Sequence, residues 1–183
     1  MKTHLWYEPG VPQSHLDATE FAAEAFAGIR NESADIEAKL LGVEIPLLPS
    51  GQYDSGWIEN VTTSSDCKLV VVTARDLGAT SLNFCFGRSN FSGGTVIASS
   101  SRIDQDTTFA GLILHELGHS SGLVEPTEAR YDKASQFAGH CVNDCVMQPV
   151  GNIQEMNGVV DKIVISPRTA GFCGGCADHL TTE

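Results

Sequence analysis

The sequence lacks any run of 18 consecutive apolar residues, so it predicts no helix that spans a membrane. Its first ten residues, MKTHLWYEPG, contain no apolar signal-peptide core, and we therefore expect a cytoplasmic protein. Basic residues are scarce: 11 Lys and Arg stand against 23 Asp and Glu, which gives a net charge of −12. This excess of negative charge argues against nucleic acids and anionic membranes as partners.

The length and apolar content are those of one folded domain. A chain of 183 residues, 42% of them hydrophobic, can bury a substantial core. We expect a single domain over residues 1–183, with the sheet and the main functional helix in residues 1–122. Residues 123–183 are expected to form a C-terminal part that is rich in cysteine.

Apolar patterning predicts helices and strands that alternate along the chain. An alanine-rich segment favours a helix at residues 18–30, and residues 53–61 are expected to form another. The expected strands are residues 43–48, 68–73, 82–86 and 95–100. Pro46 favours a sheet edge for the first of these strands. Residues 88–94 are rich in turn formers and predict a loop, so the whole pattern indicates an α+β fold around a twisted mixed sheet.

The most informative motif is H-E-L-G-H at residues 115–119. On a helix, His115 and His119 lie four residues apart, so both imidazoles project from the same face and can bind one metal ion. Glu116 projects from the adjoining face, where its carboxylate can reach a water molecule on that metal. The arrangement predicts a hydrolytic zinc site. The alternative is an ordinary amphipathic helix with two exposed histidines.

The residues around the motif favour the metal site. The apolar stretch 109–115 is compatible with a helix, and D-T-T at 106–108 can begin it with cap residues. Gly118 leaves a surface without a side chain, which allows close packing beside the metal. Gly122 can end the helix in the left-handed conformation, after which the chain can turn and bring a third ligand from outside the helix.

Four of the six cysteines form two close pairs late in the sequence: Cys141, Cys145, Cys173 and Cys176. This spacing is the layout of a four-thiolate zinc site. Disulfides are one alternative, disfavoured in a chain without an export signal. A redox C-x-x-C is another, although residues 167–172 before it do not resemble a strand. Cys67 and Cys85 stand in or beside apolar segments and are expected to be buried core thiols.

These landmarks together resemble the archaemetzincins, a branch of the metzincin zinc peptidases. The family's H-E-x-x-H-x-x-G is matched by H-E-L-G-H-S-S-G at 115–122. Its later elements H-C, C-x-M and C-x-x-C are matched at residues 140–141, 145–147 and 173–176. Upstream, T-A-R-D-L at 73–77 and L-N-F-C-F-G at 82–87 are similar to the family's T-x-x-D-L and L-N-F-V-F-G.

The resemblance covers roughly residues 46–180 and implies a zincin-like, metzincin-like fold. In that fold the H-E-x-x-H helix packs across the twisted sheet, and a zinc-stapled C-terminal subdomain lies below the site. The resemblance also implies that Met147 is the methionine of the turn beneath the catalytic metal. A methionine in the core is the simpler description of the same residue.

The third ligand departs from the family pattern. The family places a histidine three residues after the motif's glycine, where this chain has Glu125, and the His-Cys dipeptide begins only at residue 140. We interpret the difference as an insertion, which makes His140 the preferred third ligand. Glu125 is the alternative, because a carboxylate with two histidines is a known zinc set, and Asp132 is a further candidate.

The resemblance implies a zinc-dependent metallopeptidase, either an endopeptidase or an aminopeptidase, with two zinc ions per chain. One ion would be catalytic, on His115, His119 and His140, with Glu116 as the base that carries a proton from water to the leaving amine. The other would be structural, on the four paired cysteines. Peptides or proteins are the implied substrates, and we expect a monomer.

Two other classes of function remain compatible with the sequence. One is a catalytically silent zinc protein that uses the same fold as a binding module. Glu116 argues against it, because a purely structural site has no need of that carboxylate. The other is a zinc hydrolase that acts on a non-peptide amide, which the sequence does not distinguish from a peptidase.

Overall fold

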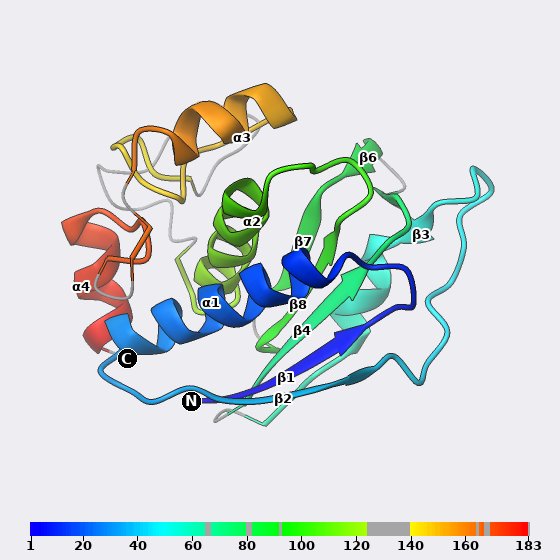
Figure 1. Ribbon diagram of the computed structural model, residues 1–183, viewed down its shortest axis with the longest axis horizontal. Coiled ribbons are helices and arrows are strands. Elements are labelled where there is room, and N and C mark those ends of the chain that lie inside the picture. Colours follow the sequence, from blue (N-terminus) through cyan, green and yellow to red (C-terminus); the bar gives the residue numbers. More distant parts are fainter. Residues whose placement is uncertain are drawn as a thin grey trace.

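A computed structural model describes residues 1–64, 67–79, 82–91, 93–123, 140–163, 165–166 and 169–182. Within this part of the chain, the main sheet has five strands (Figure 1). In spatial order they are β2 (Asp35–Leu40), β1 (Lys2–Tyr7), β4 (Cys67–Thr73), β8 (Thr95–Ser99) and β7 (Gly87–Asn90). All neighbours are parallel except β7, which runs antiparallel to β8 at one edge.

The burial of each strand follows its place in the sheet. The central strand β4 contains the apolar run L-V-V-V at residues 69–72, which are at most 3% exposed. A strand that is covered on both faces needs such a continuous apolar sequence. The edge strands do not carry such a run: β2 alternates polar and apolar residues in D-I-E-A-K-L, and β7 is the polar sequence G-R-S-N.

A smaller sheet packs beside the main one. Its described strands are β3 (Tyr53–Asp54), β5 (Leu77–Ala79) and β6 (Leu82–Cys85). The 3₁₀ helix η1 (Ser55–Asn60) follows β3, and the Asp54 carboxylate caps it by accepting a 2.9 Å hydrogen bond from the Gly56 N–H. The helix expected at residues 53–61 is therefore wrong in type, because this cap favours a tight turn directly after a short strand.

Four helices of the described chain complete the fold: α1 (Gln13–Ile29), α2 (Asp106–His119), α3 (Ile153–Val160) and α4 (Gly174–Thr182). Helices α1 and α2 lie side by side on one face of the main sheet (Figure 1). Ala22, Ala25 and Phe26 of α1 are fully buried in the core shared with α2. The small alanine side chains allow the two helices to approach closely, which positions α2 over the sheet.

The expected strands near 68–73, 82–86 and 95–100 and the helix near 18–30 are confirmed within a few residues. The strand expected at 43–48 is wrong, because only Leu47 makes an isolated bridge there, to Tyr53. The loop expected at 88–94 is also wrong in its first half, since β7 occupies it. Strands β1 and β2 were not expected. The D-I-E-A-K-L sequence of β2 alternates polar and apolar residues, which is a short strand signal. Strand β1 has the mixed sequence K-T-H-L-W-Y, and its pairing with β2 and β4 identifies it.

The architecture confirms the expected α+β class, with a twisted mixed sheet and the H-E-L-G-H helix packed across it. Among the described helices, none has both the length and the apolar character needed to cross a bilayer.

Candidate functional site

Helix α2 holds the two histidines and the glutamate of the motif inside the protein. His115 and His119 are each 5% exposed, and Glu116 is 7% exposed. The alternative of an ordinary helix with two exposed histidines is therefore wrong. The N-cap residue is Gln105, and no side chain caps the helix, so the cap expected at 106–108 lies at least one residue too late.

The end of α2 follows the prediction made from its glycine. Gly122 has a φ of 81°, in the left-handed region. Its N–H donates to the His119 carbonyl at 3.1 Å, and the Leu123 N–H donates to the Gly118 carbonyl at 3.1 Å. This pair of bonds is a Schellman motif, which satisfies the last carbonyls of a helix. The chain thus turns away immediately after the second histidine.

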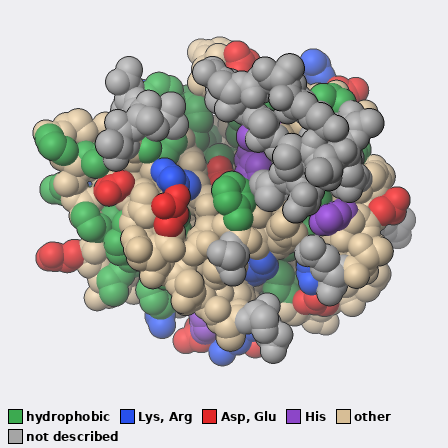
Figure 2. Space-filling view, turned by 180° about the vertical axis from the view of Figure 1, so that it is seen from behind, with side chains coloured by type: hydrophobic (Ala, Val, Ile, Leu, Met, Phe, Trp, Pro, Cys, Tyr) green, Lys and Arg blue, Asp and Glu red, His purple; other side chains and the backbone are tan. Residues whose placement is uncertain are grey.

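A third histidine joins the two on the helix. His140 Nε2 lies 3.2 Å from His119 Nε2, which itself lies 3.1 Å from His115 Nε2. The rings of His115 and His140 stack with centroids 5.1 Å apart. Histidine side chains are visible in a hollow of the face drawn in Figure 2. The alternative third ligands Glu125 and Asp132 lie outside the described residues.

The geometry of the three nitrogens fits a tetrahedral zinc ion. Zinc–nitrogen bonds of about 2.0–2.1 Å place neighbouring ligand atoms about 3.3 Å apart, close to the separations found here. Three Nε2 atoms so near one another cannot all be satisfied by hydrogen bonds among themselves. A shared cation accommodates all three lone pairs at once, so the donor set fits the metal that the motif predicts.

The ionisation of the imidazoles also suits a metal. Burial and the nearby charge of His140 lower the pKa of His115 to about 4. Burial and the other two imidazoles hold the pKa of His119 well below its ordinary value. Both rings are therefore neutral near pH 7, the form that binds metal. The Nδ1 of His115 lies 2.8 Å from the Val146 carbonyl, which keeps the proton there and leaves Nε2 free to coordinate.

Glu116 lies between the histidines and strand β7. Burial raises the pKa of its carboxyl group to about 7, against smaller opposing effects of the Ser89 hydroxyl and the Arg88 guanidinium. A Cβ atom at Gly87 would lie 2.9 Å from Glu116 Cγ and 3.0 Å from Oε1. The β7 backbone therefore passes directly beside the carboxylate, and only glycine leaves room for it. Phe91, just beyond β7, meets the His119 ring edge-on at 5.6 Å.

Met147 packs beneath the helix at the position where the motif has its glycine. A Cβ atom at Gly118 would lie only 2.5 Å from Met147 Sδ and 3.2 Å from Phe172. Met147 is fully buried, and its carbonyl accepts a 2.8 Å hydrogen bond from the Cys141 N–H. The methionine is thus wedged under α2, on the segment that also carries Val146 and its contact to the first histidine.

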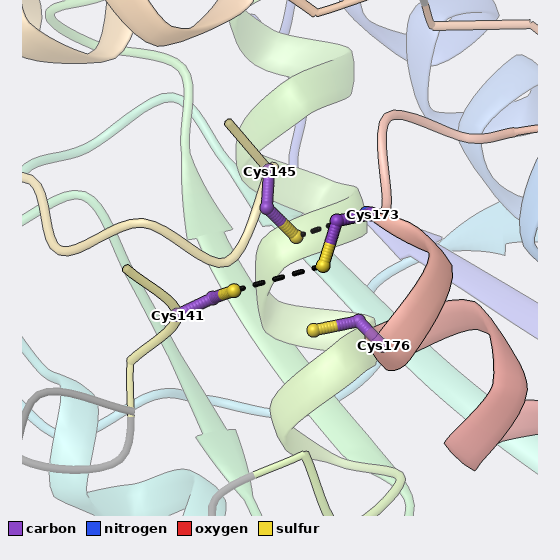
Figure 3. A group of neighbouring side chains, drawn as sticks. All are labelled: Cys141, Cys145, Cys173 and Cys176. Carbon is purple, nitrogen blue, oxygen red and sulfur yellow. Dashed lines mark hydrogen bonds between the residues drawn. The ribbon is translucent and has the colours of Figure 1, made fainter. Parts of the chain in front are cut away.

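The four paired cysteines meet in one cluster (Figure 3). Their sulfur atoms all lie within 4.8 Å of one another, and Cys141 Sγ is 3.7 Å from Cys173 Sγ. Zinc–sulfur bonds of about 2.3 Å place neighbouring sulfurs about 3.8 Å apart, so the cluster fits a tetrahedral ion. No disulfide joins them. Hydrogen bonds from Cys145 and Cys176 lower the pKa of the Cys141 thiol to about 2, which favours a thiolate in the cluster.

The two remaining cysteines lie outside the cluster. Cys67 is buried at the start of β4, as expected. Cys85 is only partly buried, at the end of β6, where burial raises the pKa of its thiol.

Several residues of the site carried no signal of their own in the sequence. Val146 acts through its backbone, so its residue type is uninformative. Ser89 and Phe91 fell in a segment interpreted as a loop. Gly87 ended the L-N-F-C-F-G stretch, but only the fold shows that it faces Glu116.

Comparison with known proteins gives a structural match. No protein-family model and no curated protein sequence matches the chain. The archaemetzincin structure from Methanopyrus kandleri is similar with a TM-score of 0.73 and 22% identity, over 100% of this chain and 94% of that one. The archaemetzincin from Archaeoglobus fulgidus, complexed with malonate, has a TM-score of 0.65 and 22% identity, over 98% and 99% of the two chains.

A zinc-dependent peptidase from Methanocorpusculum labreanum is similar with a TM-score of 0.63 and 19% identity, over 97% of this chain and 99% of that one. These matches extend along almost the whole chain and show that it has the fold of the archaemetzincin structures.

Proposed function

We propose that this chain, which has the archaemetzincin fold, is itself an archaemetzincin and acts as a zinc metallopeptidase. The observation that carries the proposal is the convergence of three imidazole Nε2 atoms from His115, His119 and His140 beside the buried carboxylate of Glu116. Three neutral ligands with an adjacent general base are the donor set of a catalytic zinc rather than a structural one.

His115, His119 and His140 would hold the catalytic zinc ion. Zinc bound there would polarise the scissile carbonyl and make the attacking water more acidic. The Val146 carbonyl fixes the ring of His115 through Nδ1, so the orientation of this ligand is set by the protein.

Glu116 is the proposed general base. Burial raises the pKa of its carboxyl group above the ordinary value, which makes the carboxylate a stronger proton acceptor. The carboxylate takes the proton of the attacking water and passes it to the amine of the leaving peptide. Burial also keeps bulk water from competing for this proton.

Strand β7 is the proposed track for the substrate. It is the outermost strand of the main sheet on the side of the metal site, and its backbone adjoins Glu116 through Gly87. An extended peptide can pair with such an edge. Its carbonyl groups would then lie between β7 and the three histidines. Binding by backbone pairing predicts tolerance of many substrate side chains.

The four cysteines would hold a second, structural zinc ion, giving two per chain. Four thiolates fill the coordination of zinc and leave no position for water. The cluster connects the segment after His140 to helix α4. The main hydrophobic core also contains residues from both ends of the chain, from Leu5 to Leu180. We therefore also propose that residues 1–183 act as one metallopeptidase domain.

The test compares wild-type protein with Glu116→Gln on a mixed peptide library, with zinc content measured in both. We expect unchanged zinc content and a loss of cleavage of about a thousandfold, because the base is removed while the ligands stay. Glu24→Gln, at an exposed position of α1, is the matched control and should cleave like the wild type.

Cleavage that survives Glu116→Gln would contradict the mechanism. Absence of cleavage by zinc-loaded wild type would favour a silent binding module, and hydrolysis of small amides alone would favour a non-peptide substrate. Peptides with free and blocked amino termini distinguish an aminopeptidase from an endopeptidase.

A further inference from the structure

Strand β2 forms the border of the main sheet opposite β7 (Figure 1). It pairs with β1 on one side, and no described strand pairs with its other side. Five of its six residues are exposed, and Leu40 is 58% exposed. An uncovered strand edge of this kind is a template for another strand.

The backbone pattern shows which groups of β2 face outward. The Asp35 N–H donates to Met1, and the Leu41 N–H just after the strand donates to Tyr7. Because backbone groups alternate in direction along a strand, the odd-numbered residues direct theirs toward β1. The even-numbered residues 36, 38 and 40 therefore point their N–H and C=O groups toward the open edge.

The two faces of β2 carry different side chains: apolar ones on the face toward α1 and charged ones on the opposite face. Ala38 is paired in register with Leu5, which belongs to the core under α1, so Ile36, Ala38 and Leu40 lie on that helix-covered side. They are apolar, yet Ala38 and Leu40 are exposed. Glu37 and Lys39 lie on the opposite face, where they contact residues of β1.

We propose that β2 pairs with β2 of a second copy of this chain, antiparallel about a two-fold axis through Ala38. The outward groups of Ala38 then exchange two hydrogen bonds across the axis, and Ile36 pairs likewise with Leu40 of the other copy. Glu37 of each copy lies opposite Lys39 of the other copy, so the interface contains two pairs of opposite charges. The two sheets become one continuous sheet, and the exposed apolar side chains of β2 cover each other.

The central register is self-complementary in both of its charged pairs. An axis through Glu37 would place two Glu37 side chains directly opposite each other, although it would also pair Asp35 with Lys39. An axis through Lys39 would place two lysines opposite each other. A shift that pairs odd with even residues would oppose inward-pointing backbone groups to outward-pointing ones. Among these registers, the central one opposes outward-pointing backbone groups and contains no pair of like charges.

The proposed dimer differs from the monomer expected from the sequence, and it is independent of the proposed function. The histidine site adjoins β7, at the other border of the sheet, so association leaves that site free. A single pair of short strands buries little area, so we expect a reversible dimer with a dissociation constant in the range of about 1–100 µM.

Sedimentation velocity from about 1 µM to about 1 mM tests the proposal. Wild type should move from monomer to dimer across this range. Glu37→Lys and Lys39→Glu should each remain monomeric, since each places two pairs of like charges across the axis. An equimolar mixture of the two variants should form a heterodimer, and the double variant Glu37→Lys/Lys39→Glu should dimerise again.

Ala38→Pro gives a second measurement. It removes an outward N–H and places a ring at the open edge, so it should weaken the dimer by at least tenfold, while no N–H that bonds to β1 is lost. Circular dichroism and thermal unfolding show whether each variant is folded. A wild type that stays monomeric overturns the proposal. So does a dimer that persists in both single charge variants, or a mixture of the two that fails to associate.

Discussion

At the scale of single residues, the site depends on how closely Glu116 is packed. Its carboxylate adjoins the bare backbone of Gly87, and its raised pKa results from that burial. A glycine at this point of β7 is needed for space, because any side chain would occupy the position of the carboxylate. The same reasoning applies to Gly118 above Met147.

We predict that Gly87→Ala reduces kcat/KM by about a hundredfold, because the new methyl group must displace the carboxylate by a fraction of an ångström or more. Zinc content should be unchanged, since the three histidines are not touched. Gly158→Ala is the control: a Cβ atom there meets nothing within 4 Å, and its activity should equal that of the wild type. Full activity of Gly87→Ala would show that the base does not act from this position.

At the scale of secondary-structure elements, Glu8 connects the two sheets. It follows β1, and its carboxylate accepts hydrogen bonds from the Thr73 hydroxyl of β4 (2.6 Å), the Tyr53 hydroxyl of β3 (2.6 Å) and the Ala74 N–H (3.1 Å). Burial alone would raise the pKa of Glu8, but these donors outweigh it and lower the pKa below its ordinary value.

A lowered pKa in the folded state gives stability above the unfolded-state pKa of about 4.3 that is lost as the pH falls through the folded-state value. We predict that Glu8→Gln is less stable than wild type at pH 6 and that the difference shrinks toward pH 3. Urea unfolding at several pH values measures this. Acid also releases metal from imidazole and thiolate ligands, so the comparison is always between variants. A difference that stays constant with pH would contradict the role of Glu8.

The elements themselves were predictable to different degrees. Strand β4 and helix α2 have strong apolar patterns, and the sequence located both. Strand β7 (G-R-S-N) has none, and β2 (D-I-E-A-K-L) has only a short alternation of polar and apolar residues, because a strand with one exposed face needs apolar residues on the other face alone. Their existence depends on the hydrogen bonds that β1 and β8 supply.

At the scale of the whole molecule, the segment after His140 links two groups that could hold a metal ion. His140 belongs to one group, and the adjacent Cys141 belongs to the other. The cysteine cluster joins this segment to α4. A metal ion bound by the four sulfurs would therefore also hold His140 in position.

We predict that Cys173→Ser lowers the zinc content by one ion and the melting temperature by about 10 °C or more, because a closed zinc site contributes strongly to folding. His140→Ala should also lose one ion and should abolish cleavage, yet shift the melting temperature much less. Elemental analysis and calorimetry measure both effects. Equal zinc content in wild type and Cys173→Ser would contradict the structural site.

The sequence by itself determined which residues could bind metal. The spacing of His115, Glu116 and His119 within one helix, and the two cysteine pairs, are local patterns that the physical chemistry of metal ligands makes interpretable. His140 could be selected through its neighbour Cys141. The tertiary structure decided what depends on residues far apart in the chain: the meeting of His140 with the helix, the β7 backbone against Glu116, and the open edge of β2. These contacts arise from packing and strand pairing, which no local pattern encodes.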